Sequence, residues 1–154
     1  MIHIVLYRPE IPPNTGNIAR LCAGTQIPLH LIRPLGFSLE DRYLKRAGLD
    51  YWQHVPLSVW DSLEDYLAAD GRGQRLVATS ARRGTMLNHF AFTERDSLLF
   101  GPETTGLPPE VWQNIPCGVR IPTRHGTVRS LNLSTCAGIV LYQALFATGA
   151  TEDW

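Results

Sequence analysis

Six short apolar runs, continuous rather than alternating with polar residues, constrain the fold of this chain more than any other feature. Strands that are apolar on both sides must be covered on both faces, which is typical of a parallel sheet. Segments with helical patterns fall between the runs and predict an α/β fold, an open, mostly parallel sheet flanked by helices. The runs lie at residues 2–7, 29–32, 54–57, 76–79, 98–100 and 119–121, and the helical segments at residues 14–22, 39–47, 62–69, 108–113 and 134–147.

Capping residues mark the ends of several expected helices. Asn14, Asp61 and Ser134 stand at the start of helical segments and can accept hydrogen bonds from the free N–H groups of a first turn. Gly48 can end the short charged helix expected at residues 39–47. These residues predict where the helices begin and end.

The length and composition indicate a single domain that spans residues 1–154. Fourteen basic residues balance fourteen acidic ones, so no global charge attracts nucleic acid, although local charge can still do so. The three cysteines and five histidines form neither a CxxC pair nor an HExxH motif, which predicts free thiols and no metal site. The apolar runs are too short for a signal peptide or a membrane span. We therefore expect a cytoplasmic protein without a membrane partner.

The segment after the first run could bind an anion. Residues 12–17 read Pro-Pro-Asn-Thr-Gly-Asn, and Arg20 lies one helical turn past Gly16. A helix N-terminus presents free N–H groups that bind anions, so Arg20 could help to orient a phosphate or substrate there. The alternative interpretation is an ordinary solvated arginine on the surface of a helix.

A second polar loop, at residues 101–106, follows the run that ends at Phe100. Ligands of open α/β sheets bind beyond the carboxyl ends of strands, so this loop is well placed for function. Gly101 would let a ligand approach the backbone, and Glu103 could accept from a ribose or an amine or face a sulfonium charge. The alternative is a turn whose prolines and glycines serve geometry only. The loop matches neither GxGxxG nor GxxxxGK[ST], which disfavours NAD and ATP.

A third loop, at residues 121–134, precedes the most apolar helix. Its backbone groups could bind a base such as adenine, and Ser130 and Asn132 offer side-chain hydrogen bonds. The helix that follows is apolar nearly all round, so it is buried in the core or in a subunit interface. A small domain can hardly bury every face of such a helix, which favours an interface with Leu141 and Leu145 in it.

In their order and spacing, these loops resemble the SPOUT superfamily of RNA methyltransferases and, within it, the SpoU branch of ribose 2′-O-methyltransferases. The resemblance covers essentially the whole chain, with matching segments at residues 7–22, 46–51, 100–108 and 129–134. It implies a deep C-terminal trefoil knot, a homodimer with the site near the subunit interface, and S-adenosyl-L-methionine as methyl donor, leaving S-adenosyl-L-homocysteine and needing no metal. The implied substrate is tRNA, methylated on the ribose of cytidine or uridine at wobble nucleotide 34.

The resemblance also assigns residues to the site. Around the cofactor it places Thr79, Gly101, Glu103, Ile121, Ser130 and Leu131. To catalysis it assigns Arg20, Asn14, Asn17, Asn132 and Tyr142. Arginine stays charged in most settings, so Arg20 is expected to position a phosphate and stabilise the oxyanion rather than to act as a free base. For Tyr142, a hydrogen bond in the subunit interface is the alternative.

This sequence differs from the family pattern in two ways, and these differences leave alternative contacts and functions open. Residues 123–128 differ from the pattern of relatives, so cofactor contacts there are not assigned. No separate RNA-binding domain is present, so dimer surfaces would have to hold the RNA. The candidate cations are Arg8, Arg33, Arg42, Lys45, Arg46, Arg82, Arg124 and Arg129. A 2′-O-methyltransferase for another tRNA or rRNA site, or a knotted RNA-binding module without catalysis, remain the alternatives, although Arg20, Glu103 and Asn132 together favour an enzyme.

Overall fold

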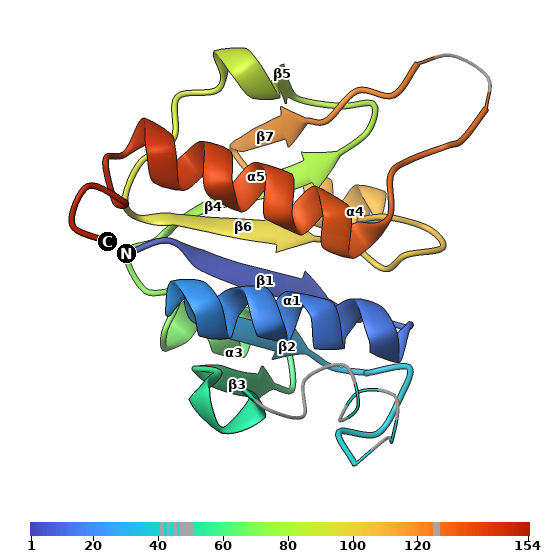
Figure 1. Cartoon of the computed structure of the whole chain (residues 1–154). Coiled ribbons are helices and arrows are strands. Elements are labelled where there is room, and N and C mark those ends of the chain that lie inside the picture. Colours follow the sequence, from blue (N-terminus) through green and yellow to red (C-terminus); the bar gives the residue numbers. More distant parts are fainter. Residues whose placement is uncertain (41, 43, 45, 47–50, 125–126) are drawn as a thin grey trace.

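A parallel β-sheet forms the centre of the molecule (Figure 1). The computed structural model describes residues 1–40, 42, 44, 46, 51–124 and 127–154. In this part of the chain the seven strands follow the order β3-β2-β1-β6-β4-β7-β5, and each pairing is parallel. The open parallel sheet predicted from the apolar runs is confirmed. The strands are β1 (His3–Tyr7), β2 (Leu29–Ile32), β3 (Leu57–Trp60), β4 (Arg75–Ser80), β5 (Thr85–Met86), β6 (Asp96–Phe100) and β7 (Cys117–Arg120).

Helices cover both faces of the sheet. Figure 1 shows α1 and α5 side by side across the near face, and these two helices contact each other. On the far face, α3 and α4 pack against a second apolar cluster. The helices whose bounds lie in the described residues are α1 (Pro12–Thr25), α3 (Leu63–Ala68), α4 (Pro109–Trp112) and α5 (Leu133–Ala147), with short 3-10 turns η1 (Trp52–His54) and η2 (Leu87–His89).

The first strand shows why its residues are apolar throughout. Ile4 and Leu6 point into the core beneath α1 and α5, whereas Val5 and Tyr7 point into the cluster on the α3 face. Successive side chains of a strand alternate between faces, so a sheet covered on both faces needs apolar residues at every position. The same alternation places Leu98 and Leu99 of β6 in opposite clusters.

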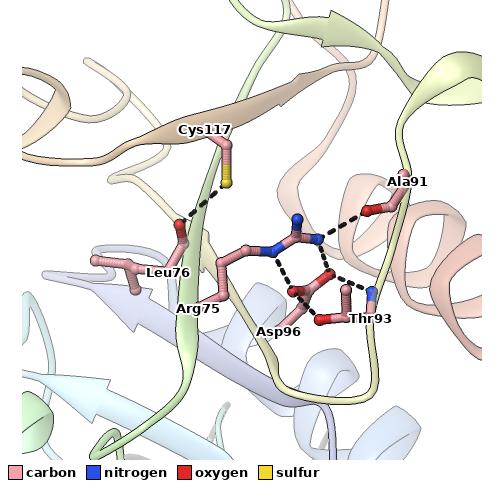
Figure 2. A network of polar contacts seen from close by, with 6 residues as sticks. All are labelled: Arg75, Leu76, Ala91, Thr93, Asp96 and Cys117. Atoms are coloured by element: carbon pink, nitrogen blue, oxygen red, sulfur yellow. Dashed lines mark hydrogen bonds and ion pairs between the residues drawn. The ribbon is translucent and has the colours of Figure 1, made fainter.

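An ion pair between a half-buried arginine and a buried carboxylate joins the amino ends of β4 and β6, as Figure 2 shows. Arg75 donates from Nε and from one terminal nitrogen to the two oxygens of Asp96, at 2.7 and 2.8 Å. Thr93 donates to Asp96 from its N–H and its hydroxyl, at 2.8 and 2.7 Å, so the buried carboxylate is well satisfied. The bond to Asp96 raises the pKa of Arg75. This network therefore links the amino ends of two neighbouring inner strands, at the opposite end of the sheet from the carboxyl ends of its strands.

The strand predicted at residues 54–57 is wrong. Residues 52–54 form η1, and β3 begins at Leu57 and pairs in register with Leu29. Pro56 lacks an N–H group for the ladder, so pairing begins after it. The two-residue strand β5 was also missed, because so short a segment leaves no pattern.

The predicted cap of the first helix is also wrong. α1 begins at Pro12, with Ile11 at the N-cap position and no side-chain cap, and Asn14 lies inside the first turn. Two prolines open this helix because their fixed φ suits a first turn and the N–H groups they lack have no partner there.

Two other caps lie beside the predicted residues. Ser62, rather than Asp61, caps α3, because its hydroxyl accepts from the N–H of Asp65 at 3.0 Å. Asn132, rather than Ser134, caps α5. Within the helix predicted at residues 39–47, residues 42, 44 and 46 are helical, whereas residues 41, 43, 45 and 47 and the predicted end at Gly48 lie outside the described residues.

The last helix buries one side and exposes the other. Leu141 and Leu145 are 0% and 1% exposed and pack into the chain's own core, so their prediction as interface residues is wrong. The exposed apolar side chains of α5 are Ile139, Tyr142 and Phe146, with Phe146 64% exposed. A helix that contacts β6 and α1 on one side can bury only that side within a single chain.

Candidate active site

A cavity of about 660 Å³ opens at the carboxyl ends of β4, β6 and β7. In the strand order, β6 and β4 lie on the opposite side of β1 from β2 and β3, so the connections after β1 and β6 diverge here. Such a switch point is where open α/β sheets bind ligands. All six residues predicted to bind the cofactor line the cavity, together with Asn14 and Asn132. Their roles stay a prediction.

The loop after β6 folds back on itself at Gly101. A Cβ atom there would lie 2.3 Å from the backbone nitrogen of Leu107 and 2.4 Å from the carbonyl carbon of Gly106. No side chain fits in that space, so glycine is required by the loop's own packing. Gly101 also lines the cavity, and the interpretation that it lets a ligand approach the backbone stays a prediction.

The carboxylate of Glu103 is committed to the start of α1. Its oxygens accept from the backbone N–H groups of Glu10 and Ile11, at 2.8 and 3.0 Å, and from the side-chain amide of Asn14 at 3.5 Å. In return, Glu10 accepts from the hydroxyl of Thr104 at 2.8 Å. A carboxylate is favoured at a helix N-terminus, and it locks the loops after β1 and β6 together.

This arrangement corrects the predicted anion site at α1. Glu103 already takes the N–H group of Ile11 at the N-cap position. Pro12 and Pro13 have no N–H group, and the N–H of Asn14 bonds to the carbonyl of Ile11 at 3.1 Å. The first turn therefore has no backbone N–H group left to bind a phosphate. The available groups are already hydrogen-bonded, and the two prolines have none.

Asn132 joins the starts of α1 and α5 at the cavity. Its amide nitrogen donates to the Asn14 side-chain oxygen at 2.9 Å. Its own oxygen accepts from the N–H of Ser134 at 2.9 Å and caps α5. A continuous chain of side chains therefore runs from Glu103 through Asn14 to Asn132, across three segments that are distant in sequence.

Hydroxyl and backbone contacts form the rest of the cavity wall. The buried Thr79 hydroxyl donates to the carbonyl of Leu99 at 2.9 Å, and Ile121 N–H donates to Ser80 at 2.9 Å. Burial raises the pKa of Cys136, which also lines the cavity, so it stays a neutral thiol. Three arginines line the cavity as well: Arg82, Arg83 and Arg129.

Three residues assigned to catalysis do not line the cavity of their own chain: Arg20, Asn17 and Tyr142. Arg20 and Asn17 are exposed on α1, and Tyr142 is exposed on α5. The guanidinium of Arg20 lies over the ring of Tyr51, with its central carbon 5.0 Å from the ring centre. Tyr51 was missed as a candidate because a contact between a loop and a helix leaves no spacing signal in the sequence.

The cations proposed to hold RNA have different surroundings. Arg33 forms an ion pair with Asp61 at 3.0 Å, which makes it a weaker candidate. Arg82 and Arg129 line the cavity, and Arg8 lies over the ring of Tyr7. Lys45 lies outside the described residues.

The described residues contain neither a candidate metal site nor a helix that could cross a membrane. Their His, Cys, Asp and Glu side chains include no group of three placed to hold a metal ion. Every helix in these ranges falls short of the length and apolarity that a membrane crossing requires.

Comparison with known proteins gives consistent matches. Residues 1–142 match the SpoU rRNA Methylase family. The chain is 49% identical over 146 residues to a tRNA (cytidine(34)-2′-O)-methyltransferase of Methylovorus glucosotrophus, with 94% of each chain covered. It is 44% identical to a protein with the same description from Aeromonas hydrophila, covering 94% of this chain and 92% of that one.

Solved structures give the same pattern. One described by the words "Structural insights into the 2-OH methylation of C/U34 on tRNA" has a TM-score of 0.89 and 52% identity, with 96% of this chain and 95% of that chain covered. An AdoMet-bound rRNA methyltransferase from Sinorhizobium meliloti has a TM-score of 0.83 and 25% identity, with 94% of this chain and 56% of that chain covered.

Proposed function

The chain belongs to the SpoU rRNA methylase family, and from this premise we propose that it transfers a methyl group from S-adenosyl-L-methionine to the 2′-hydroxyl of cytidine or uridine 34 in tRNA. The observation that carries the proposal is the full-length similarity to tRNA (cytidine(34)-2′-O)-methyltransferases. The cavity supports it, because the residues predicted for the cofactor lie together there.

The cavity suits the cofactor in size and chemistry. Its volume of about 660 Å³ is within the range of small-molecule sites. Apolar side chains such as Leu107, Trp112 and Ile121 can pack against an adenine, and the arginines Arg82 and Arg83 suit the carboxylate of an amino acid. The backbone of the loops after β6 and β7 supplies further donors and acceptors.

In the proposed mechanism the protein aligns the ribose hydroxyl with the methyl donor and stabilises the negative charge that develops on the oxygen. When bound, the cofactor supplies a methyl group on a sulfonium, so the donor needs no further activation. The ribose hydroxyl is a weak acid that must lose its proton as it attacks, and alignment therefore matters most. The Arg20 guanidinium, a fork of N–H donors, would hold an adjacent phosphate and stabilise the developing oxyanion. Asn14 and Asn132 hold the starts of α1 and α5 at the cavity.

We infer that two copies of the chain complete the site as a homodimer. Arg20, Asn17 and Tyr142 do not line the cavity of their own chain. The apolar side of α5, with Tyr142 and Phe146 exposed, offers the surface for pairing. A partner packed there would cover this side and bring its own α1 toward the cavity. The deep trefoil knot and the cytoplasmic location stay predictions.

Similarity favours tRNA over rRNA as the substrate. The tRNA-specific relatives share nearly half of their residues with this chain, whereas the rRNA methyltransferase from Sinorhizobium meliloti shares 25% and is a longer protein. A module without catalysis is disfavoured, because the named enzymes match along almost the whole chain.

The direct test is methylation of total tRNA by the purified protein with labelled cofactor, followed by mapping of the modified nucleotide. We expect label on the ribose of nucleotide 34. Label at another nucleotide would contradict the proposed substrate but keep the reaction. No heat of binding with S-adenosyl-L-homocysteine in calorimetry would contradict the cofactor as well.

A further inference from the structure

We propose that Tyr51 is a positioning residue that orients the Arg20 guanidinium for methyl transfer; this inference rests on the proposed function. The guanidinium carbon lies 5.0 Å from the centre of the Tyr51 ring. This distance falls within the range of about 6 Å over which a cation is attracted to an aromatic face. Tyr51 ends the matched segment at residues 46–51, and the sequence assigns it no role.

The aromatic contact leaves the chemistry of Arg20 available. In the described part of the chain, its guanidinium contacts neither a carboxylate nor a hydrogen-bond acceptor. A carboxylate partner would occupy two N–H donors and cancel the charge. An aromatic face attracts the cation through its quadrupole and leaves all five donors for an incoming oxygen. The ring can therefore orient the cation without neutralising it.

The backbone segment that carries Tyr51 is attached to the helix that carries Arg20. The carbonyl of Tyr51 accepts from the N–H of His54 at 2.8 Å as η1 begins. Gln26, at the C-cap of α1, donates to the carbonyl of His54 at 3.5 Å, and Trp52 packs against the core beneath α1. The backbone of Tyr51 is thus held beside α1, where its ring contacts the guanidinium, and we infer that this contact restricts the rotamers of Arg20 before the substrate binds.

Loss of the ring should affect rate more than binding. Tyr51 acts through Arg20, and a freer guanidinium occupies the reactive orientation for a smaller fraction of the time. We therefore expect kcat to fall while KM for tRNA and Kd for the cofactor change by less than about twofold.

The test compares Tyr51→Phe, which keeps the ring, with Tyr51→Leu, which removes it. In single-turnover methylation of tRNA we expect Tyr51→Leu to be roughly 2- to 30-fold slower, the range that such a contact contributes. Tyr51→Phe should keep most of the rate; an equal loss in both variants would mean that the hydroxyl acts, and would overturn the inference. Phe90→Leu is the matched control, because its ring lies 5.2 Å from the guanidinium of Arg75, which does not line the cavity.

A second readout does not depend on methylation. The ring current of Tyr51 should shift the NMR signals of the Arg20 side chain, and the shift should persist in Tyr51→Phe and vanish in Tyr51→Leu. A folded Tyr51→Leu variant that methylates tRNA at the wild-type rate would overturn the inference about Tyr51 and leave the proposed function intact. A wild-type protein that leaves nucleotide 34 unmethylated would overturn the proposed function, and the NMR shift would then report whether the contact itself exists.

Discussion

His30 is buried in β2, and only one of its two ring nitrogens forms a hydrogen bond with a described residue. Trp60 donates to His30 Nδ1 at 3.1 Å, so Nδ1 carries no proton, and Nε2 has no partner among the described residues. Burial and then the nearby His3 lower the pKa of His30 to about 4, and Asp70, 3.9 Å from Nδ1, opposes them only in part. Protonation at Nδ1 would break the bond from Trp60.

We expect the free energy of unfolding to fall as the pH drops from about 6.5 toward 4. Unfolded His30 takes up a proton near its ordinary pKa of 6.5, and folded His30 only near 4, so the unfolded state binds more protons in this window. The loss is at most about 1.4 kcal/mol per pH unit for one such group. Urea denaturation between about pH 7 and about pH 5 measures it.

The control for this prediction is an exposed histidine. His30→Gln should flatten the slope of stability against pH, whereas His89→Gln should leave it unchanged. The pKa of His3 is lowered as well, so some slope should persist in His30→Gln. Identical slopes in the wild type and His30→Gln would contradict the role of His30.

Glu103 shows how far residue type and position alone could predict the site. Its place after a strand put it correctly at the edge of the cavity. Its partners, however, are backbone N–H groups of Glu10 and Ile11, more than 90 positions away along the chain. Backbone donors leave no mark in the sequence, so a carboxylate that organises a loop looks the same as one that binds a ligand.

At the scale of elements, Asn132 combines two roles that substitution can separate. Asn132→Ala removes the cap of α5 and should lower the free energy of unfolding by about 1 kcal/mol. Asn132→Asp keeps the acceptor for Ser134 but loses the donor to Asn14, so it should restore stability and not activity. Thermal denaturation and methylation assays measure the two effects. Full activity in Asn132→Asp would show that the bond to Asn14 is dispensable.

The exposed side of α5 leads to a separate prediction about the oligomeric state. Phe146→Asp should give a folded monomer, because the residue is 64% exposed in the single chain and its change costs little there. Ala69→Asp, an exposed position after α3 on the opposite face, should leave the assembly unchanged. Light scattering after gel filtration measures the mass, and a Phe146→Asp dimer would contradict pairing through this side of α5.

Sequence patterns predicted β1 and β2 closely and β3 wrongly, and burial explains the difference. β1 and β2 are covered on both faces, so their apolar runs match the observed strands closely. β3 is only half-buried, contains Ser58 and follows Pro56, and its run misled the prediction. α5 was predicted as apolar all round, but sequence alone could not assign its sides, because the packing partner decides which side is covered.

At the scale of the whole molecule, the proposed site is divided between two kinds of surface. The cavity at the strand ends contains Asn14, Asn132 and Glu103, whereas Arg20 lies over Tyr51, away from the cavity lining. Under the proposed function, a single chain would hold the parts of the site without bringing them together. A two-fold dimer in which each α1 faces the partner's cavity would assemble two complete sites.

Mixed dimers test this arrangement. Arg20→Ala removes the arginine, and Ile121→Trp fills the cavity, so each variant alone should be inactive. If Arg20 serves the partner's cavity, a mixed dimer regains one intact site, made of the arginine of one chain and the cavity of the other. Random exchange makes half of the dimers mixed, so methylation should recover to about a quarter of the wild-type rate. Without recovery in a mixture whose subunit exchange is verified by mass spectrometry, both groups must act within one chain, and Arg20 would have to reach its own cavity by a movement of α1.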